Sequence, residues 1–112
     1  MYYKLEYTDN LPEGKAGQAK FWFIKIRPSY KDDIGLLNHE IEHVRQFWRY
    51  GLLVHQVLYP LSKQYRLKCE VEAYKIQLKY YTDDRTELFA EFICNNYSLN
   101  VEKEDVIKML TY

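Results

Sequence analysis

Hydrophobic and polar residues alternate near the start of the chain with the period of a β-strand. Within Tyr2 to Thr8, tyrosine and leucine alternate with charged residues, which would give a strand one apolar and one polar face. Ala19 to Arg27 is rich in aromatic and β-branched residues, and the intervening Asp9 to Gly17 has the glycine, proline and asparagine content of a loop. We predict that the two strands pair as an antiparallel hairpin.

Further along, apolar residues recur at the three- and four-residue intervals of a helix. A helix that starts near Ser29, with Asp32 completing a capping box, and that stops at Gly51 would carry them as one stripe. This stripe comprises Ile34, Leu37, Ile41, Val44 and Trp48. A second stripe, which we predict to face solvent, comprises Asn38, Glu42, Arg45 and Arg49.

Three more helices are predicted in the second half of the chain. One runs from Pro60 to about Tyr81, another from Asp83 to about Asn96, and a short one from Val101 to Leu110. The pattern predicts the α+β class, with the small N-terminal antiparallel hairpin packed on a mainly helical body and the helix that ends at Gly51 at its centre. A chain of 112 residues is expected to form a single domain, 1–112.

Charge and composition exclude several classes of partner. Sixteen basic and sixteen acidic side chains cancel, so the chain lacks the basic field of a nucleic-acid-binding protein. No apolar stretch reaches the roughly 20 residues that cross a bilayer, and the first residues lack the pattern of a signal peptide. Cys69 and Cys94 are too few for a disulfide framework. We therefore expect a cytoplasmic protein with neither a nucleic acid nor a membrane as its partner.

The segment His39-Glu40-Ile41-Glu42-His43 matches the pattern H-E-x-x-H. Side chains four residues apart project from one face of a helix, so both imidazoles can reach one zinc ion at about 2.0–2.1 Å. Glu40 is displaced around the helix and would reach a water on the metal, whose proton its carboxylate can accept. Nitrogen and oxygen ligands, without a thiolate nearby in the sequence, favour zinc over softer metals.

The predicted placement of the two histidines supports a metal. They lie opposite the apolar stripe, flanked by Leu36 and Phe47, and outside the predicted solvated stripe. A buried His-Glu-His group without partners would be costly, and a metal ion removes that cost. The alternative is a charged helix in which two histidines stand four residues apart by chance.

A catalytic zinc site needs a third protein ligand. The pattern H-E-x-x-H-x-x-G-x-x-H is excluded, because Gln46 and Arg49 occupy its last two defined positions. The remaining candidates are His55, Glu70 and Glu72. Glu72 belongs to a ladder of lysines typical of a solvated helix surface, whereas Glu70 lies at the margin of its helix's apolar stripe, beside a small alanine. We therefore favour Glu70 as the third ligand.

The motif H-E-x-x-H followed by E-x-x-A on a later helix resembles the gluzincins, zinc peptidases whose third ligand is a glutamate. His39, Glu40 and His43, followed by the segment from Glu70 to Ala73, match this pattern. The short chain is similar to minigluzincins and to small bacterial and phage proteins. Over residues 39–74, the resemblance implies a zinc cofactor, Glu40 as general base, and a peptide or protein as substrate.

The resemblance also raises two points outside the motif. In such enzymes an edge strand binds extended substrate, and Phe21 to Arg27 would be that strand, although it equally fits a hairpin that only covers the helix. Many relatives have an aspartate four residues after the ligand glutamate to orient a histidine, whereas this chain has Tyr74. The orienting role would then fall to the tyrosine hydroxyl or to another residue.

Two functions of different classes follow. The first is a zinc peptidase with Glu40 as general base, and the second is a non-catalytic zinc-binding or regulatory module on the same scaffold. A further possibility uses His55 as the last ligand, as SprT-like peptidases use a downstream histidine. Candidates for stabilising an oxyanion are Tyr65, Arg66, Tyr74 and His55, among which the sequence does not choose.

Overall fold

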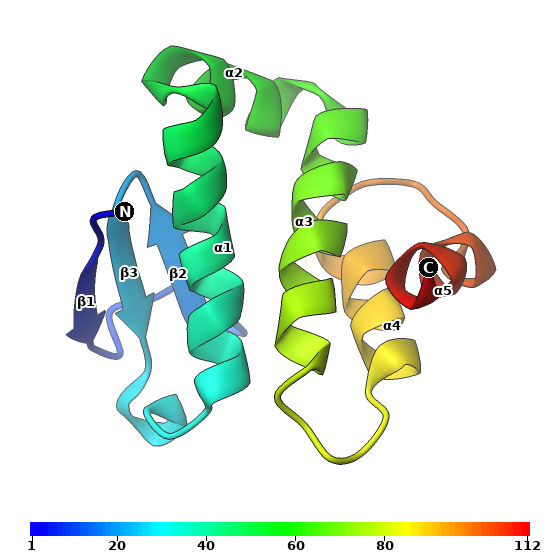
Figure 1. The fold of residues 1–112 in the computed structure, drawn as a ribbon, viewed down its shortest axis with the longest axis horizontal. Coiled ribbons are helices and arrows are strands. Elements are labelled where there is room, and N and C mark those ends of the chain that lie inside the picture. Colours follow the sequence, from blue (N-terminus) through cyan, green and yellow to red (C-terminus); the bar gives the residue numbers. More distant parts are fainter.

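The computed structural model describes all residues from 1 to 112 and shows an α+β fold, as predicted (Figure 1). The three strands are β1 (Lys4–Tyr7), β2 (Gly17–Lys20) and β3 (Phe23–Ile26). A 3-10 turn at Pro28–Tyr30 leads into the helices. These are α1 (Ile34–Tyr50), α2 (Leu52–Leu61), α3 (Lys63–Leu78), α4 (Thr86–Asn96) and α5 (Lys103–Thr111).

The sheet differs from the predicted hairpin. Its strand order is β1-β3-β2, with β1 parallel to β3 and β2 antiparallel to β3. The predicted pairing of the first two strand segments as an antiparallel hairpin is therefore wrong. The stretch predicted as one strand reverses direction between Lys20 and Phe23, where Phe21 adopts a φ of 56°. The turn was not predicted, because aromatic residues are typical of strands. The outer edge of β2 remains unpaired.

Helix α1 lies between the sheet and α3 (Figure 1). It begins after Asp33, whose carboxylate accepts a hydrogen bond from the backbone N–H of Leu36 at 3.0 Å. The predicted cap at Ser29 is wrong, because that residue belongs to the 3-10 turn. Glu42, predicted to face solvent, is 5% exposed and pairs with Arg45 at 2.7 Å, because α3 packs along this side of α1.

Two hydrophobic clusters flank a polar layer. One joins the sheet to α1 and comprises Ile24, Ile26, Leu36 and Val44. The other joins α3 to α4, α5 and the loop between them, and comprises Tyr74, Phe89, Ala90, Ile93, Leu99, Val106 and Leu110. Buried polar side chains of α1 and α3 lie between these clusters, among them His39, Glu40, Gln46 and Glu70. Such a layer is retained only where its groups satisfy one another or bind a ligand.

The segment after Gly51 is a helix, although the sequence analysis treated it as a connection. Helix α2 crosses from the end of α1 to the start of α3 at one end of the molecule (Figure 1). Pro60 lies in its last turn, and Ser62 then caps α3 by accepting a hydrogen bond from the N–H of Tyr65 at 3.2 Å. None of the helices combines the length and the apolar character needed to cross a membrane.

Candidate metal centre

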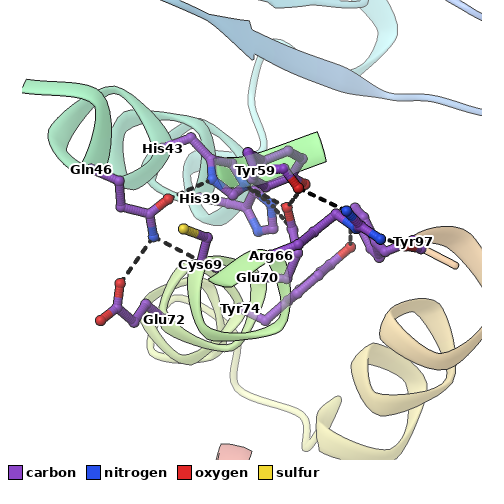
Figure 2. A network of polar contacts seen from close by, with 10 residues as sticks. All are labelled: His39, His43, Gln46, Tyr59, Arg66, Cys69, Glu70, Glu72, Tyr74 and Tyr97. Atoms are coloured by element: carbon purple, nitrogen blue, oxygen red, sulfur yellow. Dashed lines mark hydrogen bonds and ion pairs between the residues drawn. The ribbon is translucent and has the colours of Figure 1, made fainter. Parts of the chain in front are cut away.

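Helix α1 presents two histidines, one turn apart, toward α3. The Nε2 atoms of His39 and His43 are 3.2 Å apart, and their ring centroids are 4.9 Å apart. This arrangement is the direct result of the four-residue spacing, because one helical turn brings such side chains to the same face. Both rings point away from the sheet and into the polar layer (Figure 2).

Helix α3 supplies a carboxylate to the same point. Glu70 is 1% exposed, with its Oε1 3.6 Å from Nε2 of His39 and its Oε2 3.2 Å from Nε2 of His43. The structure thus brings together the three residues proposed as ligands, with one ligand atom from each inside a 4.8 Å cluster (Figure 2).

The chemistry of this cluster fits a divalent cation. Two imidazole nitrogens face one another, and Oε1 of Glu70 is buried without a hydrogen-bond partner. A cation between the three atoms would satisfy all of them at once, whereas a buried carboxylate oxygen with no partner is costly. Two histidine nitrogens and one glutamate oxygen form one of the ligand sets found in catalytic zinc sites with three protein ligands.

Gln46 orients one of the histidines. Its Nε2 donates to the backbone carbonyl of Cys69 at 3.0 Å and to Glu72 at 3.1 Å, so its Oε1 must be the acceptor facing Nδ1 of His43, at 2.9 Å. Nδ1 therefore carries the proton, which leaves Nε2 free to bind a metal. The sequence pattern predicted no role for Gln46 at the site, although this residue lies three positions after His43 on the same helical face.

Tyr59 of α2 also reaches the cluster, and its hydroxyl donates a hydrogen bond to Oε2 of Glu70 (Figure 2). Its place in the sequence gave one signal, because Tyr59 follows His55 by four residues and both face inward from α2. The hydroxyl therefore meets the same carboxylate oxygen that faces His43, and it helps to hold the carboxylate in place. Tyr59 was not among the predicted site residues, because α2 was not predicted to be a helix.

Tyr74 was a candidate to orient a histidine, but its hydroxyl does not reach one. It bonds to the hydroxyl of Tyr97 at 2.9 Å, while its ring packs edge-on against the ring of His39 at 4.3 Å. Nδ1 of His39 is buried without a hydrogen-bond partner. The Nδ1 side of this ring is therefore held by packing against Tyr74, while its Nε2 faces His43 and Glu70.

The other candidates from the sequence lie outside the cluster. Glu72 accepts from Gln46 and lies 4.0 Å from Arg49. Nδ1 of His55 is 2.7 Å from the hydroxyl of Tyr65. Of the oxyanion candidates, Tyr65 contacts His55, and Arg66 donates to backbone carbonyls of Tyr59, Pro60 and Tyr97.

Glu40 differs from the other buried charged side chains of α1. It is 5% exposed, and the structure shows no hydrogen bond or ion pair to its carboxylate. Burial raises the pKa of Glu40 above its usual value, although the neighbouring histidines oppose this. Together with His39, His43 and Glu70, it lines a cleft of about 990 Å³ that extends to β2 and α4, within the usual size of ligand sites.

The metal-free centre is expected to hold a proton. Burial lowers the pKa of His43, but the Glu70 carboxylate outweighs this effect and raises the pKa to about 9. Burial raises the pKa of Glu70, but His43 and His39 hold it below the usual value. Near neutral pH, the pair is therefore a protonated His43 facing an ionised Glu70 at 3.2 Å.

Zinc binding should release this proton. Because a metal needs the neutral imidazole, binding near pH 7 is expected to release about one proton, and zinc affinity should rise by about tenfold per pH unit until pH approaches 9. Calorimetric titrations in buffers of different ionisation enthalpy measure the number of protons. A His55→Asn variant should release the same number, since His55 lies outside the cluster. Binding without proton release near neutral pH would contradict the assignment.

Fold and centre together describe an α+β protein with a candidate His-His-Glu metal site beside a buried, unpaired glutamate. Comparisons with known proteins found no family model, no curated protein and no solved structure that matches this chain. What the centre can do therefore follows from its own residues.

Proposed function

We propose that the chain is a zinc-dependent peptidase of the gluzincin type, with His39, His43 and Glu70 as ligands. The observation that carries this proposal is the position of Glu40, a buried carboxylate without a protein partner in the same cleft as the three ligands. A purely structural metal site has no use for such a group and ordinarily closes with four protein ligands. When bound, zinc would act as a Lewis acid and lower the pKa of water.

Glu40 suits the role of a general base. Burial raises its pKa, which brings its proton affinity closer to that required for proton transfer near neutral pH. Its carboxylate makes no competing hydrogen bond, so it is free to accept a proton from the attacking water and to pass it to the leaving amine. The surrounding protein keeps the group 5% exposed, which limits exchange with bulk water.

The edge of β2 is the proposed substrate-binding element. Residues 13–21, which include β2, line the same cleft as Glu40, and β2 pairs only with β3. An extended peptide could therefore add as a further strand, using the free backbone groups of β2. This corrects the position of the strand expected from the sequence, because Phe23–Ile26 forms the central strand β3 and has no free edge.

Gly17 of β2 leaves room for the Glu40 carboxylate. A Cβ atom at this position would lie 3.2 Å from Oε2 of Glu40, so Gly17→Ala should displace the carboxylate by a few tenths of an ångström. We expect kcat/KM to fall by roughly tenfold, with zinc content unchanged, and Gly17→Val to cost more. Peptide-cleavage kinetics and metal analysis measure both quantities. An alanine variant with full activity would show that the close approach is irrelevant.

Cleavage of a degenerate peptide library tests the function directly. Zinc-loaded protein should create new peptide termini detectable by mass spectrometry, and the metal-free protein should create none. Restoring zinc to the metal-free sample should restore cleavage, which separates loss of metal from loss of fold. If the zinc-loaded protein cuts neither the library nor an unfolded protein, the peptidase proposal is wrong.

The alternative is a non-catalytic module in which zinc stabilises the fold. One observation favours it: Nδ1 of His39 lacks the hydrogen-bond partner that ordinarily orients a metal-binding histidine. In that case zinc would raise the thermal unfolding midpoint without producing cleavage. The library experiment and a thermal melt of the same samples distinguish the two functions.

A further inference from the structure

Helix α2 presents apolar side chains to solvent and polar side chains to the protein. Six of its ten residues are exposed large hydrophobics, namely Leu52, Leu53, Val54, Val57, Leu58 and Leu61. Leu53 is 77% exposed and Leu61 is 79% exposed. A helix on the surface of a globular protein ordinarily turns its apolar stripe toward the core, so the orientation of α2 is reversed.

Polar contacts hold α2 in this orientation. On its inner face, His55 contacts the hydroxyl of Tyr65, and Tyr59 donates to Glu70. Arg66 of α3 donates to the backbone carbonyls of Tyr59 and Pro60 at 2.7 and 3.0 Å. Because these bonds tie the inner face and the last turn to α3, the apolar side of α2 is held outward. Figure 2 shows the part of this network that involves Tyr59, Arg66 and Glu70.

The chain around α2 is positively charged. The segment between Glu42 and Glu70 contains no acidic residue and five basic ones, namely Arg45, Arg49, Lys63, Arg66 and Lys68. The rest of the chain therefore holds eleven basic and sixteen acidic residues. Lys63 and Lys68 are exposed. Arg45 pairs with Glu42, and Arg49 lies 3.9 Å from Glu42 and 4.0 Å from Glu72, yet both arginine side chains remain about half exposed. The exposed and unneutralised charges next to α2 are therefore Lys63 and Lys68. The chain as a whole has no net charge, but the segment that includes α2 is positively charged.

We propose that α2 and the basic residues around it dock the protein on an anionic lipid surface. A helix whose exposed side is apolar and whose flanks are basic suits the plane of a membrane interface, with its apolar side chains among the acyl chains. Lysine and arginine next to such a helix attract anionic headgroups. Ten residues extend only about 15 Å, so α2 would lie on the bilayer and not span it.

A second copy of the chain complements this surface less well. In a symmetric dimer the same patch lies on both sides of the interface, so the exposed Lys63 and Lys68 of both copies would be brought into one interface. Juxtaposed like charges oppose association, whereas anionic headgroups neutralise them. The expectation that no membrane is a partner depended on the absence of a bilayer-spanning stretch and of a signal peptide. Neither criterion detects a helix that lies on the bilayer surface, and the exposure of α2 is the reason to revise the expectation.

Co-sedimentation with lipid vesicles tests the proposal. The wild-type protein, zinc-loaded or metal-free, should sediment with vesicles of equal parts phosphatidylcholine and phosphatidylglycerol, less with phosphatidylcholine alone, and less as salt is raised. Combining Leu53→Ser with Leu61→Ser should lower the partition coefficient by at least about tenfold, because it removes apolar contact without changing charge. Lys63→Gln with Lys68→Gln should weaken binding to the anionic vesicles alone.

The matched control combines Ile34→Ser with Met109→Ser. These residues are exposed hydrophobics, 52% and 39% accessible, on α1 and α5, and their loss should leave vesicle binding unchanged. Circular dichroism melts verify that each variant folds. Absence of binding to anionic vesicles, or equal binding by the Leu53 and Leu61 variant, would overturn the proposal. So would light scattering that shows a dimer which this variant dissociates, because α2 would then cover a second copy.

Discussion

Glu40→Gln is expected to abolish peptide hydrolysis while leaving zinc bound. The amide keeps the size of the side chain but cannot accept the proton of an attacking water, and general-base catalysis of this kind contributes about 10²- to 10⁴-fold to a rate. We expect kcat to fall by roughly three orders of magnitude. Zinc content should stay at the wild-type level, because Glu40 lies outside the three-residue cluster. Peptide-cleavage kinetics and metal analysis of the same preparation measure both.

Glu42→Gln provides the matched control within the same motif. Glu42 is equally buried, but its carboxylate pairs with Arg45 at 2.7 Å, away from the cluster. Its variant should lose a little stability, since the ion pair to the half-exposed Arg45 is weakened, and should keep its activity. Full activity in the Glu40 variant, or equal loss in both variants, would refute the proposed role of Glu40.

Glu70→Ala is expected to remove zinc, whereas Glu72→Ala should retain it. Glu70 supplies the only carboxylate of the cluster, and its loss leaves two imidazoles. Removing a residue that only hydrogen-bonds to a metal ligand lowers zinc affinity by roughly 10- to 100-fold. The loss of Glu70, a ligand itself, should lower zinc affinity by more than that. Glu72→Ala should have only this smaller effect on zinc affinity, because Glu72 contacts Gln46 and not the metal site itself. Metal analysis after dialysis, with thermal melts as a check of folding, compares the two.

Glu70→Gln serves as the isosteric check on this comparison. It preserves the volume of the side chain between α1 and α3, so a loss of zinc in both Glu70 variants cannot be attributed to a cavity. A Glu72 variant that loses zinc while the Glu70 variants retain it would reassign the third ligand. Tyr59 offers a graded test, because Tyr59→Phe removes the hydroxyl on Glu70 and should weaken zinc binding less than any change at Glu70.

Local patterns predicted the helices better than the sheet. The helices from residue 86 to 96 and from 103 to 111 match the expected segments within a few residues, because their spacing and end signals are local. The pairing of β1 with β3 joins residues nearly twenty positions apart in the chain and leaves no local trace. The turn at Phe21 was missed because its residue has a strand-like composition and a positive φ that favours glycine.

Packing also changed the environment of individual residues. The second stripe of α1, which contains Asn38, Glu42, Arg45 and Arg49, predicted that Glu42 would face solvent, but α3 covers this residue. The segment after Gly51 was not predicted to be a helix, and its apolar residues are mostly exposed, because the polar side chains on the other face of α2 bind α3. In both cases a pattern on one helix could not show which neighbouring element would cover it.

The sequence by itself determined the α+β class and the presentation of His39 and His43 on one face, because both depend on periodicity within single elements. It also favoured Glu70 over Glu72 by the face of the helix on which each stands. Only the tertiary structure decided that α1 and α3 bring these three side chains together, that Gln46 fixes the tautomer of His43, and that α2 turns its leucines outward. These features depend on how separate helices pack, and no local spacing encodes that arrangement.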